Sequence, residues 1–193
     1  MPIAKSSMAD SIQAGVSKNT QEVEEAGFGG FYTVTCFDSE GRLKWEEKFH
    51  NQVTTVGVQN LNNVYFNNTA FVSWYLGLTT GVGASVPSYN TADTMSSHAG
   101  WVEVTAYSGT RKAVNWGTGA TATNPSTISN SASPAVFSIT GSATVYGAFL
   151  VNDATNGGTA GTLFSAGNFT TSAKNVVSGD TINVTYTFSA TGL

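Results

Sequence analysis

The stretch Thr181-Ile182-Asn183-Val184-Thr185-Tyr186-Thr187-Phe188 decides the fold class of this chain. Apolar and polar side chains alternate in it without a break, so Ile182, Val184, Tyr186 and Phe188 share one face. Because successive side chains of a β-strand point to opposite faces of the sheet, strict alternation predicts a strand with one buried and one wet face. The chain therefore ends in a strand that covers a core on one side.

The same signal recurs upstream in shorter segments, which are separated by runs of Gly, Ser, Thr and Asn. Several short strands with turn signals between them are typical of an antiparallel sandwich. We therefore predict a mainly β protein, an antiparallel and jelly-roll-like β-sandwich, over 27–193. Its further strands are predicted at 31–37, 43–49, 71–78, 101–104, 111–116, 135–139, 143–151 and 162–169.

Three segments break the strand pattern. Val53, Val56, Leu61, Val64 and Tyr65 recur at near-helical spacing, which predicts the one substantial helix at about 52–66. Asp93 is placed to cap a single helical turn over 94–99. The Thr/Ser/Asn-rich stretch 117–134 is predicted to be a long surface excursion, and 79–92 a loop.

Residues 1–26 are predicted to form an extended N-terminal arm. The segment is polar, and Ile12 and Val16 are placed to share one face of a short helix that Gly15 weakens. Such a segment buries too little apolar surface to offset the entropy of ordering it. If it is ordered, we expect something outside the domain to hold it. Met1–Asp10 has no apolar core, which argues against a secretory signal.

The composition points to an assembly. Hydrophobic residues make up 40% of the 193 residues, enough for a core, but charged residues make up only 10%, against about 25% in typical domains. After Lys112 the only charged side chains are Asp153, Lys174 and Asp180. So neutral a surface is expected to pack against other subunits. The net charge of −4 argues against nucleic acid or an anionic membrane as partner, and no apolar run is long enough to span a bilayer.

Candidate chemistry is sparse. The only histidines are His50 and His98, and no nucleophile elbow accompanies them. We interpret His98 and the upstream Asp93 as a hydrogen-bonded tie within a loop, because a metal site needs about three protein ligands. Glu46 and Glu47 are neighbours on a strand and so point to opposite faces. That geometry is wrong for a glycosidase pair, and we interpret both as a charged hairpin edge.

The remaining motifs also favour structural roles. The lone Cys36 excludes an internal disulfide and is predicted to be a buried, inert thiol. Gly81-Val82-Gly83 and Gly117-Thr118-Gly119 precede no helix, so they indicate turns rather than nucleotide loops. The aromatic residues are predicted to be core, with an exposed aromatic row for sugars or bases as the open alternative. The core prediction names Trp74, Trp101 and Trp116.

One stretch is more specific. Tyr75-Leu76-Gly77-Leu78-Thr79-Thr80 is followed by Asp93-Thr94-Met95-Ser96-Ser97-His98-Ala99-Gly100-Trp101-Val102-Glu103-Val104, and then by Tyr107 and Arg111. This pattern resembles small structural proteins of short-tailed bacteriophages and related prophages. The resemblance covers about 27–117 and does not extend to the arm.

The resemblance implies a capsid decoration, or cement, protein on the outside of a phage head. The implied partners are the major capsid protein and further copies of the chain, as a homotrimer. The protein would be made in the host cytoplasm and located on the capsid exterior. It implies no enzyme activity, no catalytic residue, no cofactor and no metal.

Two alternatives remain at this stage. One is a tail- or fibre-associated virion protein whose loops 79–92 and 117–134 bind host glycans. The other is a small β-sandwich enzyme or lectin, which would lose activity on replacement of His98 or Asp93. The sparse chemistry argues against the second.

Overall fold

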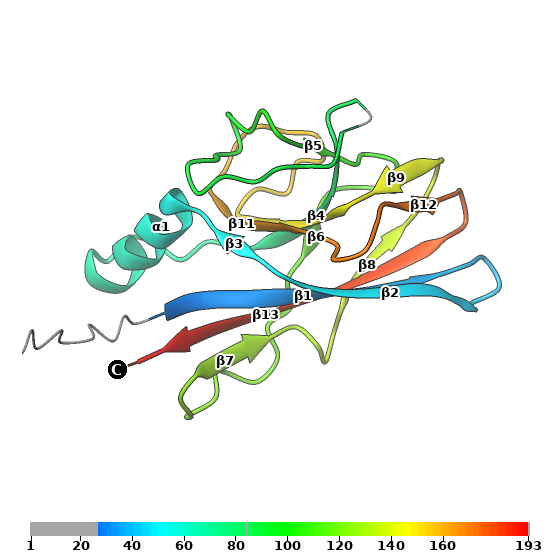
Figure 1. The fold of residues 1–193 in the computed structure, drawn as a ribbon. Helices are drawn as coiled ribbons and strands as arrows, with labels where there is room; N and C mark the ends of the chain where they lie inside the picture. Colours follow the sequence, from blue (N-terminus) through cyan, green and yellow to red (C-terminus); the bar gives the residue numbers. More distant parts are fainter. Residues whose placement is uncertain (1–26, 84, 193) are drawn as a thin grey trace, which may run out of the picture.

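The computed structural model describes residues 27–83 and 85–192, and within them the chain is a mainly β, antiparallel sandwich with one α-helix (Figure 1). The predicted fold class is confirmed. The predicted arm over 1–26 lies outside the described residues.

The first sheet is built around the stretch that decides the fold. Strand β13 pairs with β1 over its whole length, from Gly27 opposite Thr191 to Phe37 opposite Thr181. The first and last strands of the sandwich therefore lie side by side, as Figure 1 shows. The sheet has the order β2-β1-β13-β7, with β8 also on β13. Its strands are β1 (Gly27–Phe37), β2 (Leu43–His50), β7 (Ser126–Ser129), β8 (Ala135–Ser138) and β13 (Thr181–Thr191).

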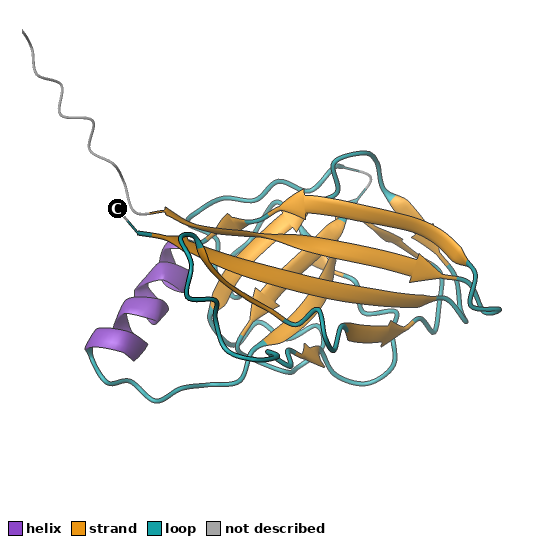
Figure 2. Ribbon diagram, turned by 90° about the horizontal axis from the view of Figure 1, so that it is seen from below, coloured by secondary structure: helices purple, strands orange, loops and turns teal. Residues whose placement is uncertain are grey.

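The second sheet packs face to face against the first (Figure 2). Its central strands β10 and β11 are almost wholly buried, as their continuous apolar character predicts. Its order is β3-β11-β10-β4-β5, with β6 also on β4. The strands are β3 (Gln52–Val53), β4 (Tyr75–Thr80), β5 (Val102–Glu103), β6 (Lys112–Ala113), β10 (Gly147–Val151) and β11 (Leu163–Asn168), and a separate pair joins β9 (Ala143–Val145) to β12 (Lys174–Val176).

Helix α1 (Thr55–Phe66) lies at one end of the sandwich, and the prediction of a helix at about 52–66 is confirmed with a later start. The Thr54 hydroxyl accepts a hydrogen bond from the amide of Gly57 at 3.0 Å and caps the helix. Gly57 is the only buried residue of α1. A Cβ there would lie 2.6 Å from the carbonyl oxygen of Phe164, so this glycine allows the helix to sit directly on β11.

Four local predictions are wrong. The strand predicted at 71–78 begins only at Tyr75, and the preceding segment stays exposed at Phe71 and Val72. The predicted helical turn over 94–99 is a tight turn closed by a bridge between Thr94 and Ser97. The Asp93 carboxylate is engaged elsewhere, as described below, and so does not cap a helix.

The excursion predicted at 117–134 contains β7, which pairs with β13. Its sequence, Ser126-Thr127-Ile128-Ser129, is too polar to show the apolar alternation by which strands are recognised. The strand predicted at 143–151 is divided at Tyr146 into β9 and β10, which pair with different partners. The break results from this pairing with different strands. No local feature of the sequence at Tyr146 indicates it.

Candidate docking site: an apolar groove at one end of the sandwich

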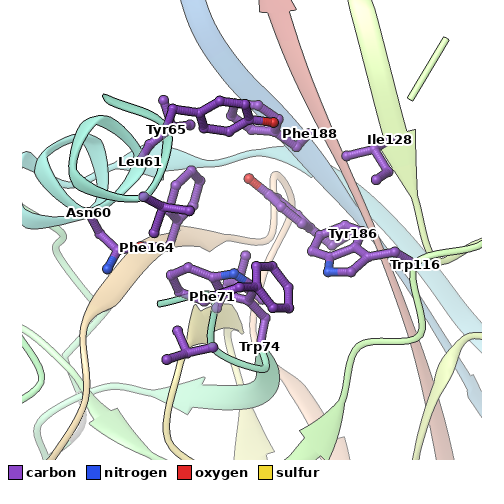
Figure 3. A pocket seen from close by; sticks show the side chains of 13 residues that line it. Asn60, Leu61, Tyr65, Phe71, Trp74, Trp116, Ile128, Phe164, Tyr186 and Phe188 are labelled. Atoms are coloured by element: carbon purple, nitrogen blue, oxygen red, sulfur yellow. The ribbon is translucent and has the colours of Figure 1, made fainter. Parts of the chain in front are cut away.

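The core opens to the surface beside helix α1, where the two sheets and the segment after the helix leave an apolar groove (Figure 3). The groove has a volume of about 300 Å³. Its lining comes from α1, from the segment before β4 and from both sheets. The lining side chains are Asn60, Leu61, Val64, Tyr65, Phe71, Val72, Trp74, Trp116, Ile128, Leu150, Phe164, Tyr186 and Phe188.

The floor of the groove is continuous with the core. Leu150, Phe164 and Tyr186 are buried and come from β10, β11 and β13. The ring of Phe164 meets Trp74 edge-on at 5.4 Å between centroids and Phe188 at 5.5 Å. Such aromatic pairs fix each other's orientation, so the floor is a rigid apolar surface held by both sheets.

The rim is exposed. Tyr65 is 79% and Phe71 72% exposed, and the neighbouring Phe66 is 85% exposed. Soluble monomers seldom present contiguous large apolar side chains to water, and such patches mark interaction sites. The geometry therefore supports docking of an apolar group or segment.

Two of the three tryptophans predicted to be core lie at this groove. Trp101 is fully buried, as predicted, but Trp74 and Trp116 are only partly buried and line the groove. The β-like spacing of the three tryptophans does not indicate how deeply each is buried. An inward-facing residue at an open end of a sandwich has the same periodicity as one at its centre.

The groove is electrostatically neutral at neutral pH. None of its lining residues is charged. The Tyr186 hydroxyl accepts a hydrogen bond from the Asn51 side-chain amide at 2.8 Å, and burial raises the pKa of Tyr186 well above its ordinary value. The groove is thus suited to an uncharged, apolar occupant.

The residues singled out for possible catalysis or metal binding form a structural tie. The Asp93 carboxylate accepts hydrogen bonds from the Trp101 indole at 3.2 Å and from the Asn90 amide at 3.1 Å. His98 stacks on the Trp101 ring at 3.9 Å, and its Nδ1 lies 3.0 Å from the Trp101 carbonyl oxygen. The interpretation of His98 and Asp93 as a hydrogen-bonded tie within a loop is confirmed.

The two neighbouring glutamates do point to opposite faces. Glu46 is exposed, but Glu47 is buried, so its assignment to a charged edge is wrong. The Lys174 ammonium lies 2.9 Å from the Glu47 carboxylate, and the Thr171 hydroxyl donates to it as well. Burial raises the pKa of Glu47, but the hydrogen bonds from Thr171 and Lys174 outweigh burial and hold this pKa below its ordinary value.

Cys36 is buried, as predicted. Burial raises its pKa to about 11, so the thiol is protonated and unreactive at neutral pH. The two Gly-X-Gly stretches precede no helix in the part of the chain that the structure describes, and both lie in loops between strands.

Arg111 is buried, although the sequence indicates it only as part of the pattern that resembles phage proteins. The Arg111 guanidinium binds the Glu103 carboxylate at 2.7 Å and donates to the carbonyl oxygens of Asp153, at 3.1 Å, and Gly158, at 2.6 Å. Its forked donors tie the segment before β6 to strand β5 and to the loop between β10 and β11. In the sequence, only the rarity of charged residues in the second half of the chain indicated that this cluster has a special role.

Within residues 27–83 and 85–192, no cluster of three or more His, Cys, Asp or Glu side chains is placed to bind a metal ion. Nor is any helix in that part of the chain long and apolar enough to cross a membrane. No protein-family model, curated protein sequence or solved structure matches the chain.

Proposed function

We propose that this chain is a structural virion protein, a capsid decoration protein that binds the outer surface of a phage head and stabilises contacts between capsomers. The observation that carries the proposal is the apolar groove at one end of the sandwich, rimmed by Tyr65 and Phe71. The sequence resemblance and the low charge of the chain also support it. The proposed partners are the major capsid protein and, as a homotrimer, further copies of this chain.

The arrangement of the chain ends suits such a role. Strand β1 begins at Gly27, opposite Thr191 near the end of β13, and both lie at the α1 end of the sandwich (Figure 2). The ring of Phe28 stacks on Phe188 of the groove at 6.2 Å. One end of the molecule therefore presents the groove and the root of residues 1–26 together, and we propose that this end faces the shell.

Clamping by such a subunit is a multivalent effect. Each groove and each arm makes a weak contact, but an oligomer links several contacts, and the second contact forms at a high effective concentration. A trimer that joins neighbouring capsomers resists the outward pressure of packaged DNA. No reacting group is required for this role.

The test is the copy number of the chain in purified particles, measured against the major shell protein by quantitative mass spectrometry. A ratio near parity is the expected result, because a decoration protein follows the capsid lattice. A ratio far below parity would overturn the proposal and place the chain in the tail or fibres, where glycan-binding loops are the competing role.

A second measurement separates the arm from the sandwich. A chain that lacks residues 1–26 keeps the whole described core, so its circular dichroism is expected to match that of the full chain. We expect it to lose binding to undecorated heads. Normal binding by this folded variant would contradict a role for the arm.

A further inference from the structure

The groove is uncovered by any described part of the chain, although its rim consists of large apolar side chains. Tyr65 and Phe71 are each more than two-thirds exposed, and the lining is uncharged. An apolar surface of this kind is expected to be covered in solution. The question is which uncharged segment covers it.

The start of β1 places one segment within reach. The ring of Phe28 stacks on Phe188, which lines the groove, at 6.2 Å between centroids. The chain that precedes Gly27 is thus tethered at the edge of the groove. The connection 17–26 can span about 33 Å when extended, at about 3.3 Å per residue. Residues near 11–17 can therefore reach any part of the groove.

The sequence of this segment matches the groove in chemistry. Residues 11–17 read Ser-Ile-Gln-Ala-Gly-Val-Ser and contain no charge, whereas Asp10 and Lys18 flank them. Ile12 and Val16 are four residues apart, the spacing at which two side chains share one face of a helix. An uncharged segment with two branched apolar side chains suits an uncharged groove of about 300 Å³, at the small end of the range of roughly 300–1,000 Å³ for ligand pockets.

We propose that the N-terminal segment 11–17 occupies the groove, with Ile12 and Val16 packed between the rim and the aromatic floor. Tethering gives the segment a local concentration on the order of millimolar, so modest apolar burial suffices to hold it. This inference concerns the free chain, before the groove meets the shell, and so goes beyond the proposed function. The segment can prove absent from the groove while the copy number in particles is near parity. Equally, the segment can occupy the groove while the copy number is far below parity.

Photo-crosslinking of the full chain tests the proposal. Phe71→p-benzoylphenylalanine places a photoreactive ring on the exposed rim, and Leu43→p-benzoylphenylalanine places the same ring at β2, where Leu43 is 59% exposed and outside the groove lining. Trypsin cleaves after Lys5 and Lys18, so the predicted contact lies in peptide 6–18. We expect position 71, and not position 43, to link to this peptide. No link from position 71 to 6–18, or equal links from both positions, would overturn the proposal.

Variants within the segment provide the second measurement without touching the sandwich. Ile12→Asp together with Val16→Asp is expected to lower the yield of the 6–18 link at least about tenfold, because burial of both side chains is lost. Ser11→Asp together with Ser17→Asp adds the same charge and is expected to keep most of the link. Equal yields from the two double variants would overturn the assignment. A mixture of ¹⁵N-labelled and unlabelled chains shows whether the segment belongs to the same chain or to a neighbouring copy. A link within one chain is expected, and links only between chains would overturn the tethered arrangement.

Discussion

At the scale of single residues, Glu46 and Glu47 show how one step along a strand changes the role of a carboxylate. Glu46 faces water, whereas Glu47 faces inward and holds Lys174 and Thr171. Lys174 is the first residue of β12, so this ion pair joins β12 to β2, and Thr171 joins the loop before β12 to the same strand. A buried charge is tolerated because it is paired and hydrogen-bonded.

Glu47→Gln tests this role through the pH dependence of stability. The folded-state pKa of Glu47 lies below the ordinary value of 4.5, so its stabilisation is fully present above about pH 4.5. It is lost as the pH falls through the folded-state pKa. At pH 7 we expect the free energy of unfolding of the variant to be about 1–3 kcal/mol lower than that of the parent chain. This is the usual range for hydrogen bonds to a charged group. Below pH 4.5 this difference should shrink.

Urea unfolding at a series of pH values measures both effects. Glu46→Gln is the matched control, because it makes the same chemical change one residue away on the exposed face. Its stability is expected to follow the parent chain across the series. A Glu47→Gln variant that unfolds like the control at pH 7 would show that the buried pair contributes nothing.

At the scale of elements, α1 is positioned by contact rather than by propensity. Gly57 and a run of Asn residues make its sequence a poor helix former, and the Thr54 cap supplies one local stabilising contact. What places the helix is the close approach of Gly57 to β11. Since α1 supplies one wall of the groove, this contact also sets the width of the groove.

Gly57→Ala sets helix propensity against packing. Alanine is favoured over glycine in a helix by about 1 kcal/mol, but the added Cβ would lie 2.6 Å from the Phe164 carbonyl oxygen and 2.9 Å from its Cα. Backbone atoms cannot yield as a flexible side chain can, so we expect a net loss of about 1–3 kcal/mol in unfolding free energy. Gln59→Ala, on the exposed side of the same helix, is expected to change stability little. Thermal unfolding of the two variants measures these effects. A Gly57→Ala chain that is more stable than its parent would show that helix propensity outweighs the steric contact with Phe164.

At the scale of the whole molecule, β13 holds the first sheet together. It pairs with β1 along one edge and with β7 and β8 along the other. Ile182, Val184 and Tyr186 are fully buried in the core. The main partner of β13 is β1, which lies far from it in the sequence, so the first sheet closes only when these two distant segments meet.

This topology predicts the pattern of amide hydrogen exchange. The slowest amides are expected in the paired centres of β1 and β13, because they open only in global unfolding. The two-residue strands β5 and β6 and the segment 67–74 are expected to exchange first. Exchange monitored by mass spectrometry measures this order. Slower exchange in α1 than in β13 would contradict the central role of the last strand.

Alternation and periodicity in the sequence determined the fold class, the strand 181–188, the strands 31–37 and 43–49, and the existence of the helix. These follow from local rules, since a face that alternates must bury one side. Only the tertiary structure decided that β13 pairs with β1, that polar β7 is a strand and that Glu47 is buried. It also decided that the core opens at Trp74 and Trp116. Those outcomes depend on which distant segment lies opposite, and no local pattern carries that information.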